Sequence, residues 1–248
     1  MRKIRSTIRF ILLVSSTFGT YAVWYLLRFF IPNKQYWRQF AFGVWARNWV
    51  RICGIDIEVI GTPPKSPYFL VSNHLGYIDI PVIRSALTGV FVAKHEIETW
   101  RFAGKIVRNM GTIFVNRQNR RDIPRAGHEI IEALSRGEGV IVFPEGTSTR
   151  GDEVLPFNSS FLEFAARTDT PVSYLSISYR TPEGEPPPSE AVTWWDDTAF
   201  LPHLLRMLEV KRFTAVLNFG DEPVINHDRK HLAAELRHKV QESFIPVI

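Results

Sequence analysis

A histidine and an aspartate five residues apart are the first residues of this 248-residue chain that suggest chemistry. His74 and Asp79 follow residues 68–71, an apolar run with the composition of a short buried strand. An imidazole titrates near neutral pH, and a nearby carboxylate can orient it and stabilise its charged form. Residues five apart on a helix point away from each other, so a contact requires a non-helical loop, which Gly76 permits. We predict a His74/Asp79 dyad that acts as general base on an alcohol.

Asp79 also fits a second interpretation, the start of a helix. It is followed by Ile80 and Pro81, and an aspartate with a proline in the next turn is typical of a helix N-terminus. In that case His74 would be a loop histidine without a catalytic role. These eight residues alone leave both interpretations open.

The composition is that of a globular protein with an anionic partner. Hydrophobic residues make up 45% of the chain and charged residues 22%, which argues against disorder and suits one large α/β domain or two small ones. The formal net charge of +5 favours nucleic acid, a membrane surface, or a phosphorylated or CoA-bearing substrate. The single cysteine, Cys53, excludes an intrachain disulfide and a cysteine-based zinc site.

Residues 1–53 have the features of a membrane-docking helix pair. Residues 10–27 carry no charge and are just long enough to cross a bilayer core, while residues 36–53 mix tryptophan and phenylalanine with arginine, as interfacial helices do. Positive charge flanks the first stretch on both sides, so no crossing orientation follows. We expect two helices that dip into or lie on one leaflet. The alternatives are a signal peptide, for which no clear cleavage site follows, and a pair packed on its own soluble domain.

Residues 54–248 alternate β-rich runs with helical patterns. Strands are expected at 55–60, 68–72, 90–93, 112–115, 140–143, 172–179 and 214–219. Helices are expected at 81–87, 96–110, 124–136, 161–167, 199–209 and 228–244, and the proline-rich stretch 181–188 is expected to be a loop. The alternation predicts an α/β fold, a twisted and mostly parallel sheet covered by helices, forming one catalytic domain. Sites in such sheets gather beyond the carboxyl ends of strands, where His74 lies.

Two later strand ends also carry polar residues. Arg117 follows the strand expected at 112–115, and its guanidinium could donate two parallel hydrogen bonds to a phosphate, although a solvated arginine is the simpler interpretation. The strand at 140–143 runs into a turn that presents Glu145, Gly146 and Thr147. This turn could be purely structural, or it could offer a carboxylate and backbone N–H groups to a ligand.

Three motifs in this order resemble the glycerolipid acyltransferase family, which includes 1-acylglycerol-3-phosphate acyltransferases. They are NHLGYID at 73–79, GTIFVNR at 111–117 and FPEGTSTR at 143–150, and a fourth, looser match begins at Thr170. The ordered triple is far more specific than any single motif, and the resemblance covers residues 68–179. The basic, aromatic N-terminal segment also looks like the family's membrane-docking element.

Three departures from the family pattern concern acceptor recognition more than proton transfer. Ser148 follows the FPEGT box where many members have arginine, and Arg150 comes two positions later. Asn158 follows Pro-Phe where many members carry a basic residue and a glycine, and the fourth box lacks the second proline of close lysophosphatidate enzymes.

The resemblance implies transfer of a fatty acyl group from acyl-CoA or acyl carrier protein to the free hydroxyl of a lysolipid, foremost 1-acylglycerol-3-phosphate, giving phosphatidic acid. His74 would take the hydroxyl proton and Asp79 would orient His74. Backbone N–H groups around Gly146 and Thr147 are candidate oxyanion donors. We expect direct transfer without an acyl-enzyme, because the chain has no G-x-S-x-G motif.

The resemblance further places Arg117 against the acceptor's phosphate. Glu145 would accept a hydrogen bond from an acceptor hydroxyl or position Arg117. No metal or cofactor is expected beyond the acyl donor, and the expected location is the cytoplasmic face of the bacterial inner membrane, in contact with membrane lipid.

Four alternatives stay open. One keeps the chemistry on another acceptor, a lyso-ornithine lipid or another lysophospholipid. One is a metal-dependent hydrolase using His74, Asp79 and Glu145, although His74 belongs to no HxxxH or HxH pair that would support it. A third is a peripheral protein that binds anionic lipid. Nucleic-acid binding is the weakest, because the basic residues are dispersed, and we expect no nucleic-acid partner.

Overall fold

A computed structural model describes residues 1–116 and 122–247 of the chain. Within them, seven strands form one sheet in the order β1-β7-β6-β2-β5-β3-β4. The strands are β1 Ile55–Ile60, β2 Tyr68–Ser72, β3 Val90–Lys94, β4 Ile113–Val115, β5 Gly139–Val142, β6 Val172–Arg180 and β7 Phe213–Phe219. Neighbouring strands are parallel except β6 and β7, which are antiparallel. The predicted mostly parallel sheet is confirmed, with strand bounds within one residue of the expected ones.

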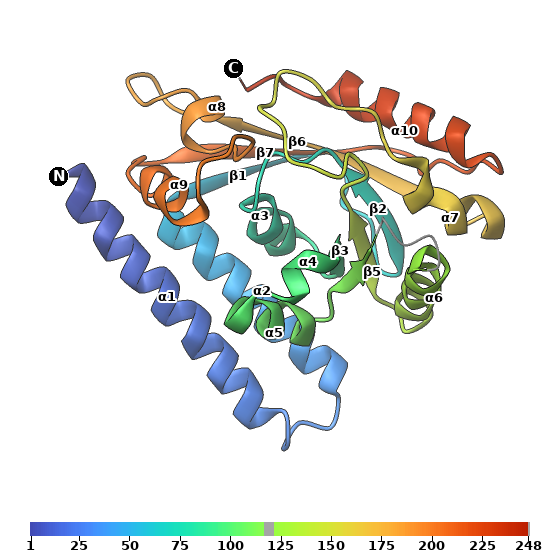
Figure 1. The fold of residues 1–248 in the computed structure, drawn as a ribbon, viewed down its shortest axis with the longest axis horizontal. Helices are drawn as coiled ribbons and strands as arrows, with labels where there is room; N and C mark the ends of the chain where they lie inside the picture. The colour runs from blue at the N-terminus through green and yellow to red at the C-terminus, as the bar shows by residue number, and fades with distance from the viewer. Residues whose placement is uncertain (117–121, 248) are drawn as a thin grey trace.

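The sheet is buried because its central strands are apolar on both faces. All five residues of β2 and all four of β5 are buried, as expected of parallel strands covered on both sides. In Figure 1, α10 (Arg229–Ser243) lies along one face, and α2 (Lys34–Cys53) and α3 (Asp79–Ala86) lie on the other. Further helical segments are α6 Asp122–Ser135, η1 Ser159–Leu162, α7 Glu163–Thr168, α8 Pro188–Ala191 and α9 Phe200–Met207.

The prediction of a single helix at 96–110 is wrong in one respect. The structure has two helices there, α4 (His95–Glu98) and α5 (Arg101–Asn109). The chain turns at Trp100, whose backbone is extended with ψ of 121°. Gly104 permits the resulting close approach, since a Cβ there would lie 2.2 Å from the Glu98 carbonyl oxygen. Helix α8 is an addition to the expected elements; it begins at Pro188, at the end of the proline-rich loop, where proline suits the first helical turn.

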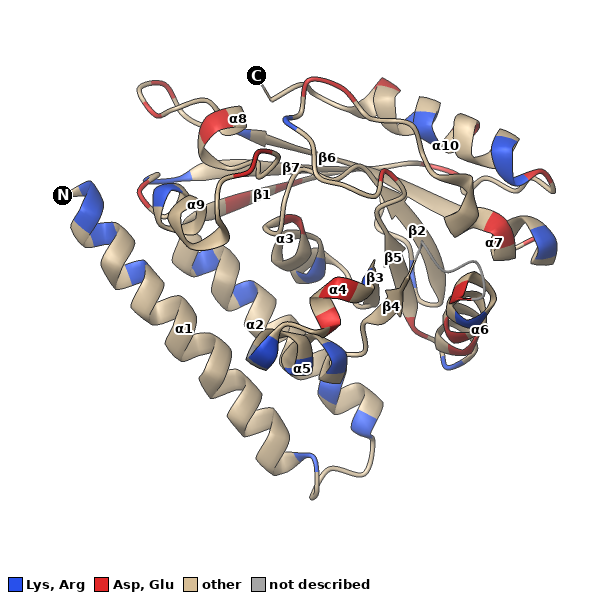
Figure 2. Ribbon diagram, viewed as in Figure 1, with Lys and Arg blue, Asp and Glu red and all other residues tan. Residues whose placement is uncertain are grey.

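An N-terminal helical hairpin lies against the sheet-bearing part of the chain. Helix α1 (Arg2–Leu27) is long and apolar enough to cross a membrane by length and composition, and only 11% of its most apolar eighteen-residue window is buried. Figure 2 shows basic residues at both ends of α1 and along α2. Helix α2 packs on α3 and β1, whereas α1 packs mainly on α2. The hairpin ends at Cys53, where the predicted boundary lies, but the division into two domains stays a prediction.

Candidate active site

Asn73 fixes the direction in which the chain leaves β2. Its buried side chain donates from Nδ2 to the Ile177 carbonyl oxygen at 2.9 Å and accepts from the Ile177 N–H at Oδ1 at 2.8 Å. Ile177 lies on β6, two residues beyond Leu175, the last partner of β2 in the parallel ladder. An asparagine amide offers both a donor and an acceptor, so this side chain continues the ladder after the backbone has left it. The loop that follows therefore starts from a rigid point.

The predicted contact between His74 and Asp79 is present. Nδ1 of His74 lies 2.7 Å from Oδ2 of Asp79, and the four residues between them form a non-helical loop. Asp79 is the first residue of α3, and Ile78 is the N-cap. Its Oδ2 also accepts the N–H groups of Leu75 and Gly76, at 2.7 and 3.1 Å. The helix start and the dyad are thus one arrangement, in which the carboxylate both fixes the loop and holds the imidazole.

Tyr179 completes the surroundings of this carboxylate. Asp79 is fully buried, and its Oδ1 accepts a hydrogen bond from the Tyr179 hydroxyl at 2.6 Å. Burial, together with the neighbouring charge of Asp79, raises the pKa of Tyr179 well above its ordinary value, so the phenol is a neutral donor. These hydrogen bonds offset the cost of burying a charge. Tyr179 was not among the site residues predicted from the sequence. A buried tyrosine in a predicted strand signals that its hydroxyl has a partner.

The hydrogen-bond network leaves Nε2 as the basic nitrogen of His74. Because Nδ1 faces a carboxylate, it carries the proton, and Nε2 keeps its lone pair. Within residues 1–116 and 122–247, Nε2 takes part in no hydrogen bond or ion pair, and the side chain is 22% exposed. The imidazole also stacks on Phe143, with ring centroids 4.1 Å apart and an angle of 16° between the planes. Its plane is therefore fixed while its basic nitrogen stays accessible.

Glu145 joins the loops that follow β2 and β5. Its Oε1 accepts the His74 N–H at 2.6 Å and its Oε2 accepts the Leu155 N–H at 2.9 Å. Burial raises the pKa of Glu145 to about 8, against the opposing effect of the two backbone hydrogen bonds. Each oxygen retains a second lone pair, so the predicted role toward the acceptor stays a prediction. The observed role is to position the backbone of His74.

The turn after Glu145 contains the candidate oxyanion donors. Gly146 has φ of +80°, which favours glycine, and its N–H donates to the Phe143 carbonyl at 3.2 Å. This N–H is therefore already engaged in closing the turn. Thr147 is exposed, and within the described chain its N–H donates to no protein group. Of the two predicted positions, Thr147 is the better placed to donate to a developing oxyanion, a role that stays a prediction.

Arg117 lies outside the described residues, so its predicted role stays a prediction. Strand β4 ends at Val115, and its parallel pairing with β3 places its carboxyl end at the same edge of the sheet as His74. Across residues 1–116 and 122–247, no group of three or more His, Cys, Asp or Glu side chains is arranged to hold a metal ion. The metal-dependent hydrolase alternative therefore gains no support.

Comparison with known proteins identifies the family of this chain. The family model named Acyltransferase matches residues 56–178. A lyso-ornithine lipid O-acyltransferase of Rhodobacter capsulatus is 34% identical over 197 residues, which cover 75% of this chain and 68% of the relative. The chain belongs to the acyltransferase family. It is an O-acyltransferase, and the resemblance drawn from the three motifs is confirmed.

Two further relatives extend the comparison of this acyltransferase. A 1-acyl-sn-glycerol-3-phosphate acyltransferase of Neisseria gonorrhoeae is 29% identical over 196 residues, which cover 78% of this chain and 75% of the relative. The crystal structure of the 1-acyl-sn-glycerophosphate (LPA) acyltransferase PlsC from Thermotoga maritima superposes with a TM-score of 0.68, at 23% identity, over 98% of each chain. That coverage shows that the shared fold includes the N-terminal hairpin.

Proposed function

We propose that this acyltransferase moves a fatty acyl group from a thioester donor, acyl-CoA or acyl carrier protein, to the free hydroxyl of a lysolipid. The observation that carries the proposal is the accessible Nε2 of an imidazole whose Nδ1 is held at 2.7 Å by a buried carboxylate. Such a nitrogen suits a general base for an alcohol. The names of these relatives, lysolipid acyltransferases of two kinds, support a lysolipid as acceptor.

In the proposed reaction, Nε2 of His74 takes the hydroxyl proton as the acceptor oxygen attacks the thioester carbonyl. The new C–O bond gives a tetrahedral oxyanion, for which the Thr147 N–H is the proposed donor. The C–S bond then breaks, and the leaving thiolate takes the proton from the imidazolium. The products are an ester and a free thiol. Asp79 stabilises the imidazolium throughout, as an orienting carboxylate does in other histidine-dependent enzymes.

The first-choice acceptor is 1-acylglycerol-3-phosphate, which would give phosphatidic acid. A lyso-ornithine lipid is a specific second candidate, supported by the 34% identity to the Rhodobacter capsulatus enzyme. Ser148 stands where many members of the family carry arginine, and its hydroxyl donates to the Trp194 carbonyl. This residue is thus engaged in packing two loops together rather than offering a cation to a phosphate.

The proposed location is the cytoplasmic face of the bacterial inner membrane, because acyl-CoA and acyl carrier protein are intracellular donors. The start of α1 is tied to the protein, since Ser6 Oγ donates to the Leu205 carbonyl at 2.7 Å and Arg9 Nη1 to the Val210 carbonyl at 2.6 Å. The turn at the far end exposes Phe29 and Phe30, at 69% and 80%. The turn of the hairpin would therefore insert into the lipid ahead of the rest, and the hairpin would lie in one leaflet.

The test is an acyl-transfer assay with purified full-length protein. Palmitoyl-CoA or palmitoyl acyl carrier protein would be offered with lysophosphatidate, lyso-ornithine lipid and lysophosphatidylglycerol, and products would be read by mass spectrometry. The expected product is phosphatidic acid. Transfer to lyso-ornithine lipid alone would establish the second candidate, and no ester product from any acceptor would contradict the proposal.

A further inference from the structure

A cavity of about 480 Å³, lined by several polar side chains, lies away from His74. It is formed between α2 and the amino-terminal ends of β2 and β5, where Ser66 and Gly139 contribute to its wall. The two strands are parallel, so their amino ends lie at the edge of the sheet opposite to the His74/Asp79 dyad. Three arginines line this cavity: Arg47, Arg84 and Arg136.

Arg84 is a buried cation without an acidic partner. It is 2% exposed, and its Nη1 donates to the Leu87 carbonyl at 2.7 Å while its Nη2 donates to Gln39 Oε1 at 2.9 Å. Its Nε is buried without a hydrogen-bond partner. No carboxylate of residues 1–116 or 122–247 forms an ion pair with it. Burial lowers the pKa of Arg84 to about 10, so it remains charged at neutral pH, and a buried charge is normally paired.

Arg47 brings a second guanidinium to the same place. A Cβ at Gly43 would lie 3.3 Å from Arg47 Nη1 and 3.4 Å from Arg84 Nη1, so both groups reach into the notch that this glycine leaves. Within the part of the chain that the structure describes, no carboxylate pairs with Arg47. Two guanidinium groups this close repel each other, and an anion between them would remove that repulsion.

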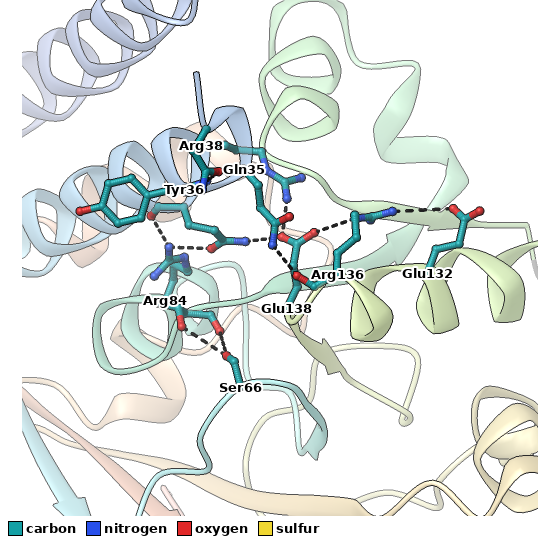
Figure 3. Close-up of polar contacts among 11 residues, drawn as sticks. Gln35, Tyr36, Arg38, Ser66, Arg84, Glu132, Arg136 and Glu138 are labelled. Carbon is teal, nitrogen blue, oxygen red and sulfur yellow. Dashed lines mark hydrogen bonds and ion pairs between the residues drawn. The ribbon is translucent and has the colours of Figure 1, made fainter. Parts of the chain in front are cut away.

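The neighbouring acids are already engaged with other cations. Figure 3 shows Arg38 and Arg136 directed at Glu138, whose Oε1 lies 3.4 Å from Arg136 Nε. Glu132 lies 3.8 Å from Arg136, and Gln39 Nε2 donates to Glu138 Oε2 at 2.7 Å. Four arginines thus face two carboxylates, which leaves an excess of two positive charges around the cavity.

The rim of the cavity belongs to the face that carries the exposed aromatic rings. Tyr36 and Phe40 line it and are 64% and 47% exposed, and the hairpin turn with Phe29 and Phe30 is a few residues away along the chain. Aromatic rings of this kind sit at the headgroup level of a membrane. Guanidinium groups bind phosphate through parallel hydrogen bonds, and Ser66 and Thr88 add hydroxyls to the wall.

We infer that this cavity binds the phosphate of an anionic membrane phospholipid, at a site separate from the one where the acyl acceptor reacts. The inference stands on the cavity and its charges and does not depend on the proposed reaction. A bound headgroup would hold α2 against the membrane and neutralise the buried Arg84. The site would make membrane binding selective for anionic lipid beyond the general attraction of a basic surface.

The test compares Arg47→Gln with Arg51→Gln. Arg51 is an exposed residue of α2 that does not line the cavity, so this matched control removes the same charge and leaves the cavity unchanged. Full-length protein would be sedimented with vesicles of phosphatidylcholine alone or with one-fifth phosphatidylglycerol, in 0.5 M NaCl to screen general attraction. We expect Arg47→Gln to weaken binding to the anionic vesicles by about tenfold more than Arg51→Gln, the effect of losing a charge-assisted hydrogen bond. Equal losses in the two variants would overturn the inference.

Two further measurements identify the ligand. Dihexanoylphosphatidylglycerol should raise the midpoint of thermal unfolding of the wild-type protein and not of Arg47→Gln, whereas inorganic phosphate at the same concentration should do so weakly. Stabilisation by inorganic phosphate alone would reject a lipid as ligand. In a transfer assay with the acceptor in detergent solution, where binding to a bilayer plays no part, Arg47→Gln should leave the KM for the acceptor unchanged. A raised KM there would make the cavity part of the acceptor site and overturn the inference of a separate site.

Discussion

The Tyr179 hydroxyl donates to Oδ1 of Asp79 at 2.6 Å, whereas Oδ2 of the same carboxylate lies 2.7 Å from Nδ1 of His74. The buried carboxylate thus links β6 to the loop that carries the imidazole. The Tyr179 hydroxyl bonds to Asp79 and not to His74, so it would act on the reaction only through Asp79. It is therefore a positioning residue, and its contribution can be separated from that of the dyad.

Replacing Tyr179 with phenylalanine should move the pH dependence of acyl transfer. With one donor fewer, the Asp79 carboxylate holds the imidazolium more strongly, so the acidic limb of the pH–rate profile should shift to higher pH. We also expect kcat to fall by about tenfold, the effect of about 1.4 kcal/mol.

The matched control for this variant is Tyr174→Phe, on the same strand. Tyr174 is half-buried, and its hydroxyl forms no hydrogen bond with the described chain. This control should leave the pH profile in place. An unchanged profile in Tyr179→Phe as well would mean that the tyrosine serves packing alone.

Replacing His74 with glutamine should remove the general base. We expect kcat to fall by about 10²–10⁴-fold, because glutamine has no basic nitrogen to take the acceptor proton. Circular dichroism and vesicle binding should match the wild type, since the side chain is partly exposed and Asp79 keeps its three other donors. Turnover within a few fold of the wild type would reject His74 as the base.

Glu145 should make the folded protein less stable as the pH rises. Its pKa in the folded state, about 8, lies above its ordinary value of 4.5, so the folded state binds more protons than the unfolded state between these values. Stability from this group is therefore present below pH 4.5 and is lost as the pH rises through 8. Urea unfolding at pH 5 to 8 measures the slope.

The variant Glu145→Gln supplies the comparison for this pH dependence. Glutamine keeps an acceptor for only one of the two backbone N–H groups, so the variant should be less stable at every pH. It should nevertheless lose less stability than the wild type between pH 5 and 8. Parallel curves for the two proteins would show that Glu145 does not titrate in this range.

Replacing Arg117 with alanine tests its predicted contact with the acceptor's phosphate. We expect the KM for lysophosphatidate to rise by about tenfold or more, the effect of losing a charge-assisted hydrogen bond, with a smaller change in kcat. The same substitution should matter less for lyso-ornithine lipid, which lacks a phosphate. An unchanged KM for both acceptors would remove Arg117 from the acceptor site.

The sequence by itself determined the sheet, the loop position of the dyad and the family. Strands and helices can be told apart in the sequence because apolar residues recur with a different period in each, and their alternation along the chain predicts the sheet. The five-residue spacing of His74 and Asp79 is enough to show that a contact between them needs a loop, because helical geometry would direct them apart. The order of the three motifs identified the family and, with it, the expected acyl-transfer reaction. The first two inferences use residues that are near each other along the chain, so local patterns were sufficient. The third uses the order of three short motifs, which the sequence shows directly.

Tertiary structure alone decided which distant groups complete the site. Tyr179 is one hundred residues from Asp79, and the Asn73 amide bonds to Ile177 because β6 lies beside β2 in a sheet order that no local pattern specifies. The same holds for Glu145, whose bond to the His74 N–H reflects the pairing of β2 with β5. The convergence of Arg47 and Arg84 likewise depends on the packing of α2 against α3, because packing brings together charges that the sequence keeps apart.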